Sequence, residues 1–234
     1  MRRFFLFVLG SICLSFGIFA EMNKKDIKSM FVKIEERQEI MKTEVTQELY
    51  EEIMGTNPSS WDSVGNQKPV NNVSWLDAVI FCNKLSLKMG FEPVYDIDGD
   101  SVTWDESDKE RDGYRLPTAD EWQNAARGDG WYKYSGSNNV EEVGWILSNS
   151  NNNLQNVGTK KPNSFGIFDM TGNVSEWCWD LYNRDNRVFL GGSYSNRPVS
   201  IQEKYVAYQN SKYANLGFRV IRGPKYIGMG MYAY

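Results

Sequence analysis

The chemistry open to this chain is limited by a residue type that it lacks. Its 234 residues include no histidine, which excludes imidazole bases, Ser-His and Cys-His nucleophile pairs and histidine-containing metal sites. Only two cysteines, Cys82 and Cys178, follow the N-terminal apolar stretch. In an exported protein they could pair. However, Cys82 falls on an apolar helical face and Cys178 lies between two tryptophans, so the sequence favours buried free thiols.

Carboxylates are the remaining candidates for chemistry. Asp96, Asp98 and Asp100 are closely spaced, but the twelve-residue spacing of an EF-hand loop is absent. Residues 93–105 are better explained as a β-hairpin that turns at Asp98-Gly99. The sequence also has no GxGxxG or P-loop motif, so no phosphate-binding loop is predicted.

One segment has a composition that no regular element explains. Residues 190–222 begin with Leu-Gly-Gly-Ser and end near Leu-Gly-Phe-Arg-Val, which is typical of packed strands. Between these ends, Asn, Arg, Ser, Gln, Lys and Tyr follow neither a helical nor a strand period. The segment therefore resembles a polar surface fixed at both ends to a rigid core.

Two clear helices are expected to support that core. The first begins after Ser74, ends at Gly90 and has an apolar face. The second begins after Thr118, which forms a capping box with Glu121. A shorter helical pattern follows Thr46. The apolar face of the first helix comprises Trp75, Ala78, Val79, Cys82 and Leu85, and that of the second Trp122, Ala125 and Ala126.

Short strands and long loops account for the rest. Alternation over residues 30–34 predicts an edge strand, and residues 187–190 and 218–221 predict two more. The Asn/Gly/Ser-rich region 127–165 is expected to be an ordered loop with short strands, because its large apolar side chains need burial. Those side chains are Trp131, Tyr132, Trp145, Ile146 and Leu147. The predicted fold class is α+β, with two helices, short strands and long ordered loops.

The N-terminal residues indicate export. Residues 1–20 resemble an export signal, with Arg2 and Arg3 before an apolar stretch and a cleavage site after Ala20. A lipoprotein signal that ends before Cys13, with lipid attached to Cys13, is the alternative. We predict a linker over 21–29, one domain over 30–222 and a C-terminal tail over 223–234. A net charge of −4 gives no reason to expect nucleic acid.

Five motifs carry a family resemblance. They are EVTQELYEEIMGTNPS, PVNNVSWLDAVIFCNKLS, GYRLPTADEWQNAARG, NSFGIFDMTGNVSEWCWD and GGSY…NLGFRV, in this order. Together they resemble the formylglycine-generating-enzyme or sulfatase-modifying-factor domain, over about residues 30–222. The resemblance implies a C-type lectin fold of the formylglycine-generating-enzyme type.

The resemblance does not extend to the catalytic residues. The oxidases of this family bind copper through a cysteine pair late in the domain, where residues 190–222 here contain no cysteine. Soft Cu(I) needs thiolate ligands. A related branch binds iron through histidines, which this chain lacks. We therefore expect no copper and no enzymatic activity, against the alternatives of unrecognised chemistry or an inactive relative with an ordinary polar loop.

The resemblance also implies a structural calcium site. In this family a GNVWEW-type segment supplies carbonyl, Asn and Glu oxygens to Ca²⁺, which suits a hard cation. Asn173, Val174 and Glu176 match that pattern. The alternative is that Asn173 forms a turn and Glu176 pairs with an arginine such as Arg115. No other cofactor is expected.

The variable proteins of diversity-generating retroelements use the same scaffold. Like this chain, they have a C-terminal segment that begins with GGS and an aromatic residue and ends with LGFR. The stretch between these ends is hypervariable in those proteins, because error-prone reverse transcription rewrites its adenine-rich codons. The resemblance implies an exported, monomeric receptor at the cell surface or in the periplasm. It would bind a protein or cell-surface component, bind no nucleic acid, and contact the membrane only through a lipid anchor. The implied ligand-binding residues are Tyr194, Ser195, Asn196, Arg197, Ser200, Gln202, Lys204, Tyr208, Asn210, Lys212 and Tyr213.

Overall fold

The computed structural model describes residues 22–107 and 111–225. The predicted export signal, Cys13 and residues 226–234 of the predicted tail lie outside the described residues. The tail's first residues are packed, since the Gly223 carbonyl accepts from Arg115 and the Pro224 carbonyl accepts from Gln38. None of the described helices has the length and apolar character needed to cross a membrane.

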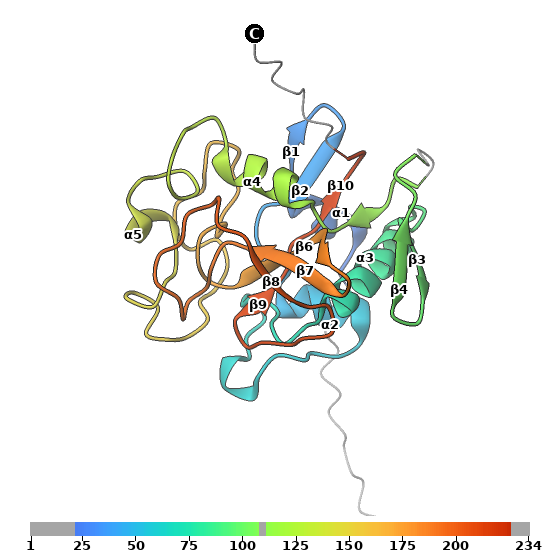
Figure 1. Ribbon diagram of the computed structural model, residues 1–234, viewed down its shortest axis with the longest axis horizontal. Helices are drawn as coiled ribbons and strands as arrows, with labels where there is room; N and C mark the ends of the chain where they lie inside the picture. Colours follow the sequence, from blue (N-terminus) through green and yellow to red (C-terminus); the bar gives the residue numbers. More distant parts are fainter. Residues whose placement is uncertain (1–21, 108–110, 226–234) are drawn as a thin grey trace, which may run out of the picture.

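Two four-stranded sheets form the centre of the molecule (Figure 1). The first has the order β1-β2-β10-β5 and is antiparallel, with β1 at the edge as the sequence predicts. The second has the order β8-β7-β6-β9, in which only β6 and β9 run parallel. The strands of the first are β1 (Phe31–Glu35), β2 (Gln38–Met41), β10 (Ile221–Arg222) and β5 (Tyr114–Arg115). Those of the second are β8 (Tyr205–Tyr208), β7 (Asn186–Leu190), β6 (Ser175–Asn183) and β9 (Leu216–Gly217).

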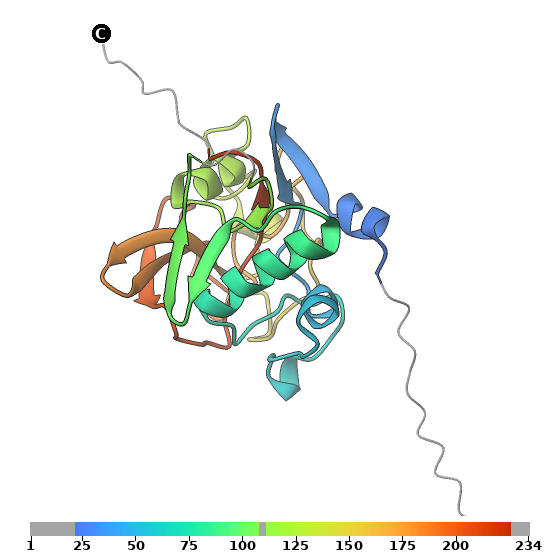
Figure 2. The ribbon, with the colours of Figure 1, turned by 90° about the vertical axis from the view of Figure 1, so that its right-hand side faces the viewer.

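A separate hairpin, β3 (Tyr95–Asp98) and β4 (Ser101–Trp104), packs beside the longest helix (Figure 2). Asp98 pairs with Ser101, so the two-residue loop is Gly99-Asp100, one residue later than predicted. Gly99 has a φ of 56°, which the first position of such a loop requires.

The two predicted helices form as expected, and three shorter ones accompany them. Both predicted caps are present, and the predicted capping box of Thr118 with Glu121 is joined by a second one, of Ser74 with Asp77. Gly90 ends the first helix at a φ of 87°, where a left-handed residue is needed. The helices are α1 (Lys24–Ser29), α2 (Gln47–Met54), α3 (Trp75–Met89), α4 (Ala119–Arg127) and α5 (Val140–Val143), with a 3₁₀ turn, η1 (Trp61–Ser63).

Two predictions about the ends of the domain are wrong. Residues 24–29 of the predicted linker form α1, whose Ile27 is fully buried, because its apolar side chain packs into the main core. Of the predicted strand over 218–221, only Ile221 lies in a strand, β10, and residues 218–220 instead connect β9 to β10, which belong to different sheets. Phe218, Arg219 and Val220 are all buried, so this crossing segment lacks the in-and-out alternation of a sheet surface.

The long loop region 127–165 is ordered but differs from its prediction. Instead of short strands it contains α5 and isolated bridges at Tyr134 and Trp145. Ile146 is buried as expected, whereas Trp131 is 80% exposed. The Arg127 guanidinium lies 5.0 Å from the centre of the Trp131 ring, and such a cation–π contact lets an indole remain at the surface. Tyr132 and Leu147 are also exposed, and Trp145 is half-buried.

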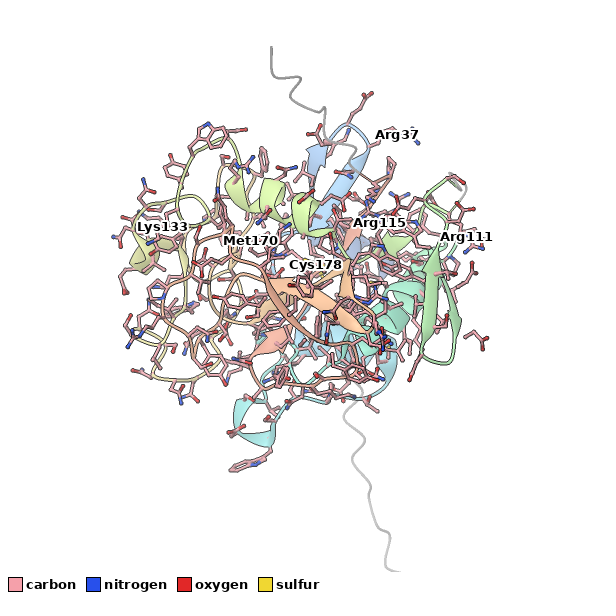
Figure 3. All side chains as sticks on the ribbon, in the orientation of Figure 1. Arg37, Arg111, Arg115, Lys133, Met170 and Cys178 are labelled. Carbon is pink, nitrogen blue, oxygen red and sulfur yellow. The ribbon has the colours of Figure 1, made fainter. Side chains whose placement is uncertain are left out.

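The prediction of buried free thiols is confirmed. Cys82 lies in the main core and Cys178 in a second cluster around Trp122. Figure 3 shows Cys178 and Met170 within the fold and Arg37 at its periphery. Burial raises the pKa of both thiols, so neither is a ready thiolate ligand or nucleophile.

Candidate binding site

Two glycines fix the start of the polar segment. Gly191 and Gly192 follow β7 directly and have φ values of 93° and 68°, which side chains other than glycine adopt at a cost. A Cβ on Gly192 would lie 2.4 Å from Cγ2 of Val199. The chain therefore turns sharply away from the sheet at this point and packs closely on itself.

A buried ion pair fixes the other end. Arg219, in the crossing between β9 and β10, holds the carboxylate of Glu176 on β6 with both groups almost fully enclosed. The two contacts are 2.6 Å (Nη2–Oε1) and 2.7 Å (Nε–Oε2). The indole of Trp122 on α4 donates to Glu176 Oε2 at 2.6 Å. Charge-assisted, two-pronged bonds of this kind are the strong ones, so they join α4, β6 and the end of the segment.

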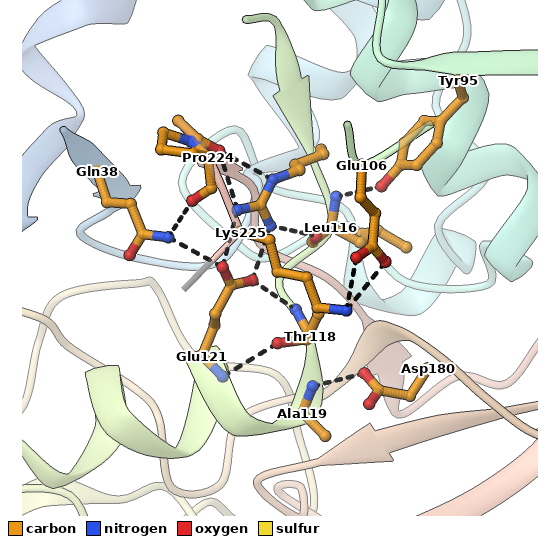
Figure 4. A network of polar contacts seen from close by, with 12 residues as sticks. Gln38, Tyr95, Glu106, Leu116, Thr118, Ala119, Glu121, Asp180, Pro224 and Lys225 are labelled. Atoms are coloured by element: carbon orange, nitrogen blue, oxygen red, sulfur yellow. Dashed lines mark hydrogen bonds and ion pairs between the residues drawn. The ribbon is translucent and has the colours of Figure 1, made fainter. Parts of the chain in front are cut away.

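Arg115 pairs with Glu121 rather than with Glu176. Its guanidinium bonds the Glu121 carboxylate at 2.7 and 2.8 Å in a fully buried position. Glu121 also accepts from the Thr118 backbone N–H and from Gln38 (Figure 4). The predicted Glu176–arginine pair therefore forms with Arg219, and the naming of Arg115 as its partner is wrong.

Other groups hold two of the three proposed calcium ligands. Both Glu176 oxygens accept from Arg219, and one also accepts from Trp122, so the charge of this carboxylate is already compensated. Asn173 Oδ1 accepts from the Gln155 backbone N–H at 3.1 Å, and Asn173 has a left-handed φ of 55°. Among the residues that the structure describes, no group of three or more His, Cys, Asp or Glu side chains could hold a metal. The geometry favours the alternative, a turn at Asn173 and an arginine pair for Glu176.

Two further carboxyls lie near this pair. Glu44 is fully buried, and its carboxyl lies against that of Asp169, to which it can hydrogen-bond only when one of the two is protonated. Burial, with the nearby Asp169, raises the pKa of Glu44 well above its usual range. Burial raises the pKa of Asp169 to about 6, although Asp169 accepts from the Gly158 N–H. Both carboxyls are buried, so neither is placed for a reaction at the surface of the polar segment.

None of the eleven predicted ligand-binding residues is buried. The segment that carries them is fixed at both ends by buried residues, since Ser193 and Leu216 are each 1% exposed. The exposed members are Arg197, Gln202, Lys204, Tyr208, Lys212 and Tyr213, and the half-buried ones are Tyr194, Ser195, Asn196, Ser200 and Asn210.

The structure brings one part of this set together. Ser193 Oγ donates to Asn196 Oδ1 at 2.6 Å and lies 3.1 Å from Ser195 Oγ. Asn215 Nδ2 donates to both serine hydroxyls. The start and the end of the polar segment thus meet in one small hydrogen-bond network, beside Tyr213.

The other predicted residues are spread along neighbouring elements. Lys204 pairs with Asp120 of α4 at 3.3 Å, near Ser200 and Gln202. Asn210 donates to Asp100 in the β3–β4 turn at 3.4 Å. Lys212 pairs with Asp77, the capping residue of α3, at 2.7 Å. The predicted set is therefore a broad face and not a single compact site.

A hollow of about 180 Å³ lies on the second sheet and includes Asn196 and Tyr213 of this face. Each of the four strands contributes one residue to it: Ser175, Phe189, Tyr205 and Leu216. The Phe189 and Tyr205 rings stack with centroids 5.7 Å apart. Loop residues Asn196, Tyr213 and Asn215 complete the lining.

Five of these seven lining residues were not predicted. Only Asn196 and Tyr213 belong to the predicted set, and the neighbouring Asn215, although polar, does not. Tyr205 could have been found, since strand alternation over 205–208 places it on the same face as Ala207. Ser175, Phe189 and Leu216 lie in strands whose pairing brings them to this face, which single-strand periodicity does not reveal.

Comparison with known proteins supports this architecture. Chaperone protein LppX of Paenibacillus barcinonensis is 34% identical over 226 residues, which cover 78% of this chain and 79% of that protein. Treponema denticola variable protein 1 superposes with a TM-score of 0.72 at 30% identity, covering 83% of this chain and 91% of that one. CarF superposes with a TM-score of 0.69 at 30% identity, covering 80% and 86%.

The family model described as the sulfatase-modifying factor enzyme 1-like domain matches residues 17–224. The predicted resemblance to this domain and to a variable protein is confirmed, and so is the predicted fold class. The chain therefore belongs to the sulfatase-modifying factor enzyme 1-like domain family.

Proposed function

We propose that this protein is a non-enzymatic, exported ligand-binding protein that presents a diversified surface on a C-type lectin scaffold. The proposal rests on a difference in burial within residues 190–222. All eleven predicted side chains retain access to solvent, while both ends of the segment are fixed by buried residues. A rigid scaffold with replaceable loop side chains is suited to binding different partners.

The placement of the thiols supports binding over catalysis. The related oxidases hold copper with two late cysteines, and residues 190–222 have none. The two thiols in the described chain are buried and have raised pKa values. Copper chemistry at the hollow would therefore lack its soft ligands.

The relatives support a macromolecular ligand. One is a variable protein and another is a chaperone by name. We propose that the ligand is a protein or another cell-surface component, that the protein acts as a monomer without a cofactor, and that the diversity arises by retroelement rewriting. Residues 1–20 would direct export to the cell surface or periplasm, with a lipid anchor if processing occurs before Cys13.

A displayed library tests the binding proposal. The eleven predicted positions would be randomised together, and the library would be selected against hen egg-white lysozyme. We expect most members to fold and selection to yield lysozyme binders that differ only at these positions. A library in which most members fail to fold would show that these side chains are part of the scaffold and would overturn the proposal.

An oxidation assay tests the alternative that the protein is a sulfatase-modifying-factor-like enzyme. The purified protein, loaded with Cu(I), would be incubated with a sulfatase-type cysteine peptide under oxygen. We expect conversion at the level of the peptide with copper alone. Conversion above that level, lost when the protein is heat-denatured, would contradict the non-enzymatic assignment.

A further inference from the structure

The hollow on the second sheet has a lining without charge. Its seven lining residues are aromatic, aliphatic, amide or hydroxyl residues. Of the charged side chains around it, Lys204 pairs with Asp120 and Lys212 with Asp77, and the Glu203 carboxylate accepts from the Tyr205 hydroxyl and the Ser200 N–H. An anionic ligand group would lose its hydration here and lie near the Glu203 carboxylate, and a cationic one would find that carboxylate already hydrogen-bonded. The hollow therefore suits a neutral group.

Its size suits one side chain. The volume of about 180 Å³ lies below the roughly 300–1,000 Å³ of pockets that enclose a whole small-molecule ligand. The walls are the stacked rings of Phe189 and Tyr205, with Tyr213 and Leu216 beside them. Aromatic rings gain most from packing against other rings in offset or edge-on arrangements. An aromatic side chain matches both the volume and the walls.

The polar atoms of the lining select among aromatic side chains. Asn196 Oδ1 accepts from Ser193, and Asn215 Nδ2 donates to Ser193 and Ser195, which fixes the orientation of both amides. Among the bonds of the described residues, Asn196 Nδ2 and Asn215 Oδ1 then remain without a partner. One is a donor and the other an acceptor, and a phenol hydroxyl both accepts and donates. Phenylalanine would leave both amide atoms unpaired.

We propose that this hollow binds a single tyrosine side chain of a partner protein, with its ring against Phe189, Tyr205 and Tyr213 and its hydroxyl between Asn196 and Asn215. The proposal rests on the proposed function for its location and adds the chemistry of the contact. A buried tyrosine in a central pocket is a common centre of binding energy in protein interfaces.

Ligand-observed NMR titration with single-residue probes tests the proposal. N-acetyl-L-tyrosinamide is expected to bind with a dissociation constant on the order of 1 mM. N-acetyl-L-phenylalaninamide should bind about 3- to 10-fold more weakly, because a hydrogen bond is lost. Methyl α-D-glucopyranoside, a neutral carbohydrate probe, should not bind at the same concentrations.

Two variants and a control locate the site. Asn196→Ala should reduce the preference for the tyrosine probe, since only the bond to Asn215 would remain, while the phenylalanine probe still binds, and Tyr205→Ala should weaken both probes at least about 10-fold. Tyr182→Ala is the matched control, since Tyr182 is 65% exposed on β6 and does not line the hollow. It should leave both affinities unchanged.

Several results would overturn the proposal: equal binding of the two amino-acid probes, binding of the glucoside alone, binding of no probe, or an equal effect of Tyr182→Ala. These failures are distinct from failure of the proposed function. If the library yields lysozyme binders and no probe binds, only the tyrosine subsite is wrong. If the probes bind and the library fails to fold, the diversified surface is wrong.

Discussion

Glu176 and Arg219 have fully enclosed charged groups and join β6 to the segment between β9 and β10. Removing one partner of such a pair leaves the other charge buried without compensation. We expect Glu176→Gln to lower the free energy of unfolding by about 3–5 kcal/mol. Urea denaturation followed by tryptophan fluorescence would measure the change.

The control for this variant is Glu142→Gln, which breaks the exposed Glu142–Lys161 pair. Such surface pairs contribute about 1 kcal/mol or less. A loss for Glu176→Gln no greater than that of Glu142→Gln would show that the buried pair does not hold the end of the binding segment.

The buried carboxyls also set a pH dependence. Burial raises the pKa of Asp169 to about 6, and the pKa of Glu44 is raised as well. An unfolded aspartate titrates near 4, so between about pH 4 and 6 the folded protein binds more protons than the unfolded chain. This contribution to stability is complete below about pH 4 and is lost as the pH rises through about 6.

Asp169→Asn should reduce the loss of stability that occurs as the pH rises through about 6. Asn suits the left-handed φ of 58° at this position, and its amide oxygen can still accept from Gly158. We expect the variant to be as stable as the native protein at pH 4 and more stable at pH 8, by on the order of 2 kcal/mol. Denaturation at both values would show it, with the exposed Asp129→Asn as control. An unchanged difference between pH 4 and pH 8 would be evidence against this titration.

At the scale of elements, the turn after β7 determines where the binding segment leaves the sheet. Gly192→Ala places a Cβ in a left-handed position and 2.4 Å from Val199. Gly55→Ala, at a φ of 78° with no atom within 4 Å, carries the backbone strain alone. We expect Gly55→Ala to cost about 1–2 kcal/mol and Gly192→Ala about 1–3 kcal/mol more. Equal thermal-denaturation losses for the two variants would show that the packing at Gly192 is unimportant.

Elements with local signals could be predicted from the sequence. The caps at Ser74 and Thr118 and the glycine at 90 define α3 and α4 correctly, because capping bonds are made within a few residues. The crossing of residues 218–220 from one sheet to the other could not be predicted, since it depends on strands β2 and β6 far away in the sequence. The exposure of Trp131 likewise depends on its contact with Arg127.

Only part of the candidate site could be predicted from the sequence. Composition identified the irregular segment and hence Asn196 and Tyr213. The hollow itself required the order of four strands, which places Ser175, Phe189 and Tyr205 side by side. Pairing order is a property of the whole fold and not of any one strand. The partner of Glu176 could not be identified for a related reason, since Arg219 lies 43 residues away.

At the scale of the whole molecule, the scaffold and the binding face should be separable. Replacing the six exposed candidate side chains together by alanine should change the unfolding free energy by no more than about 2 kcal/mol, because exposed substitutions each contribute within about 0.5 kcal/mol. Near-ultraviolet circular dichroism should remain native. Loss of cooperative unfolding would mean that the face and the core are one unit. The six are Arg197, Gln202, Lys204, Tyr208, Lys212 and Tyr213.

The most direct test of the central claim is to sequence the DNA around this gene in many isolates. We expect a reverse transcriptase gene and a near-copy of the codons for about residues 190–222, which differs from the gene chiefly at adenines. We also expect that differences between isolates concentrate at codons such as those of Asn196 and Tyr213, while those of Glu176 and Arg219 stay constant. An identical segment in every isolate, with neither a near-copy nor a reverse transcriptase nearby, would contradict the claim that this surface is diversified.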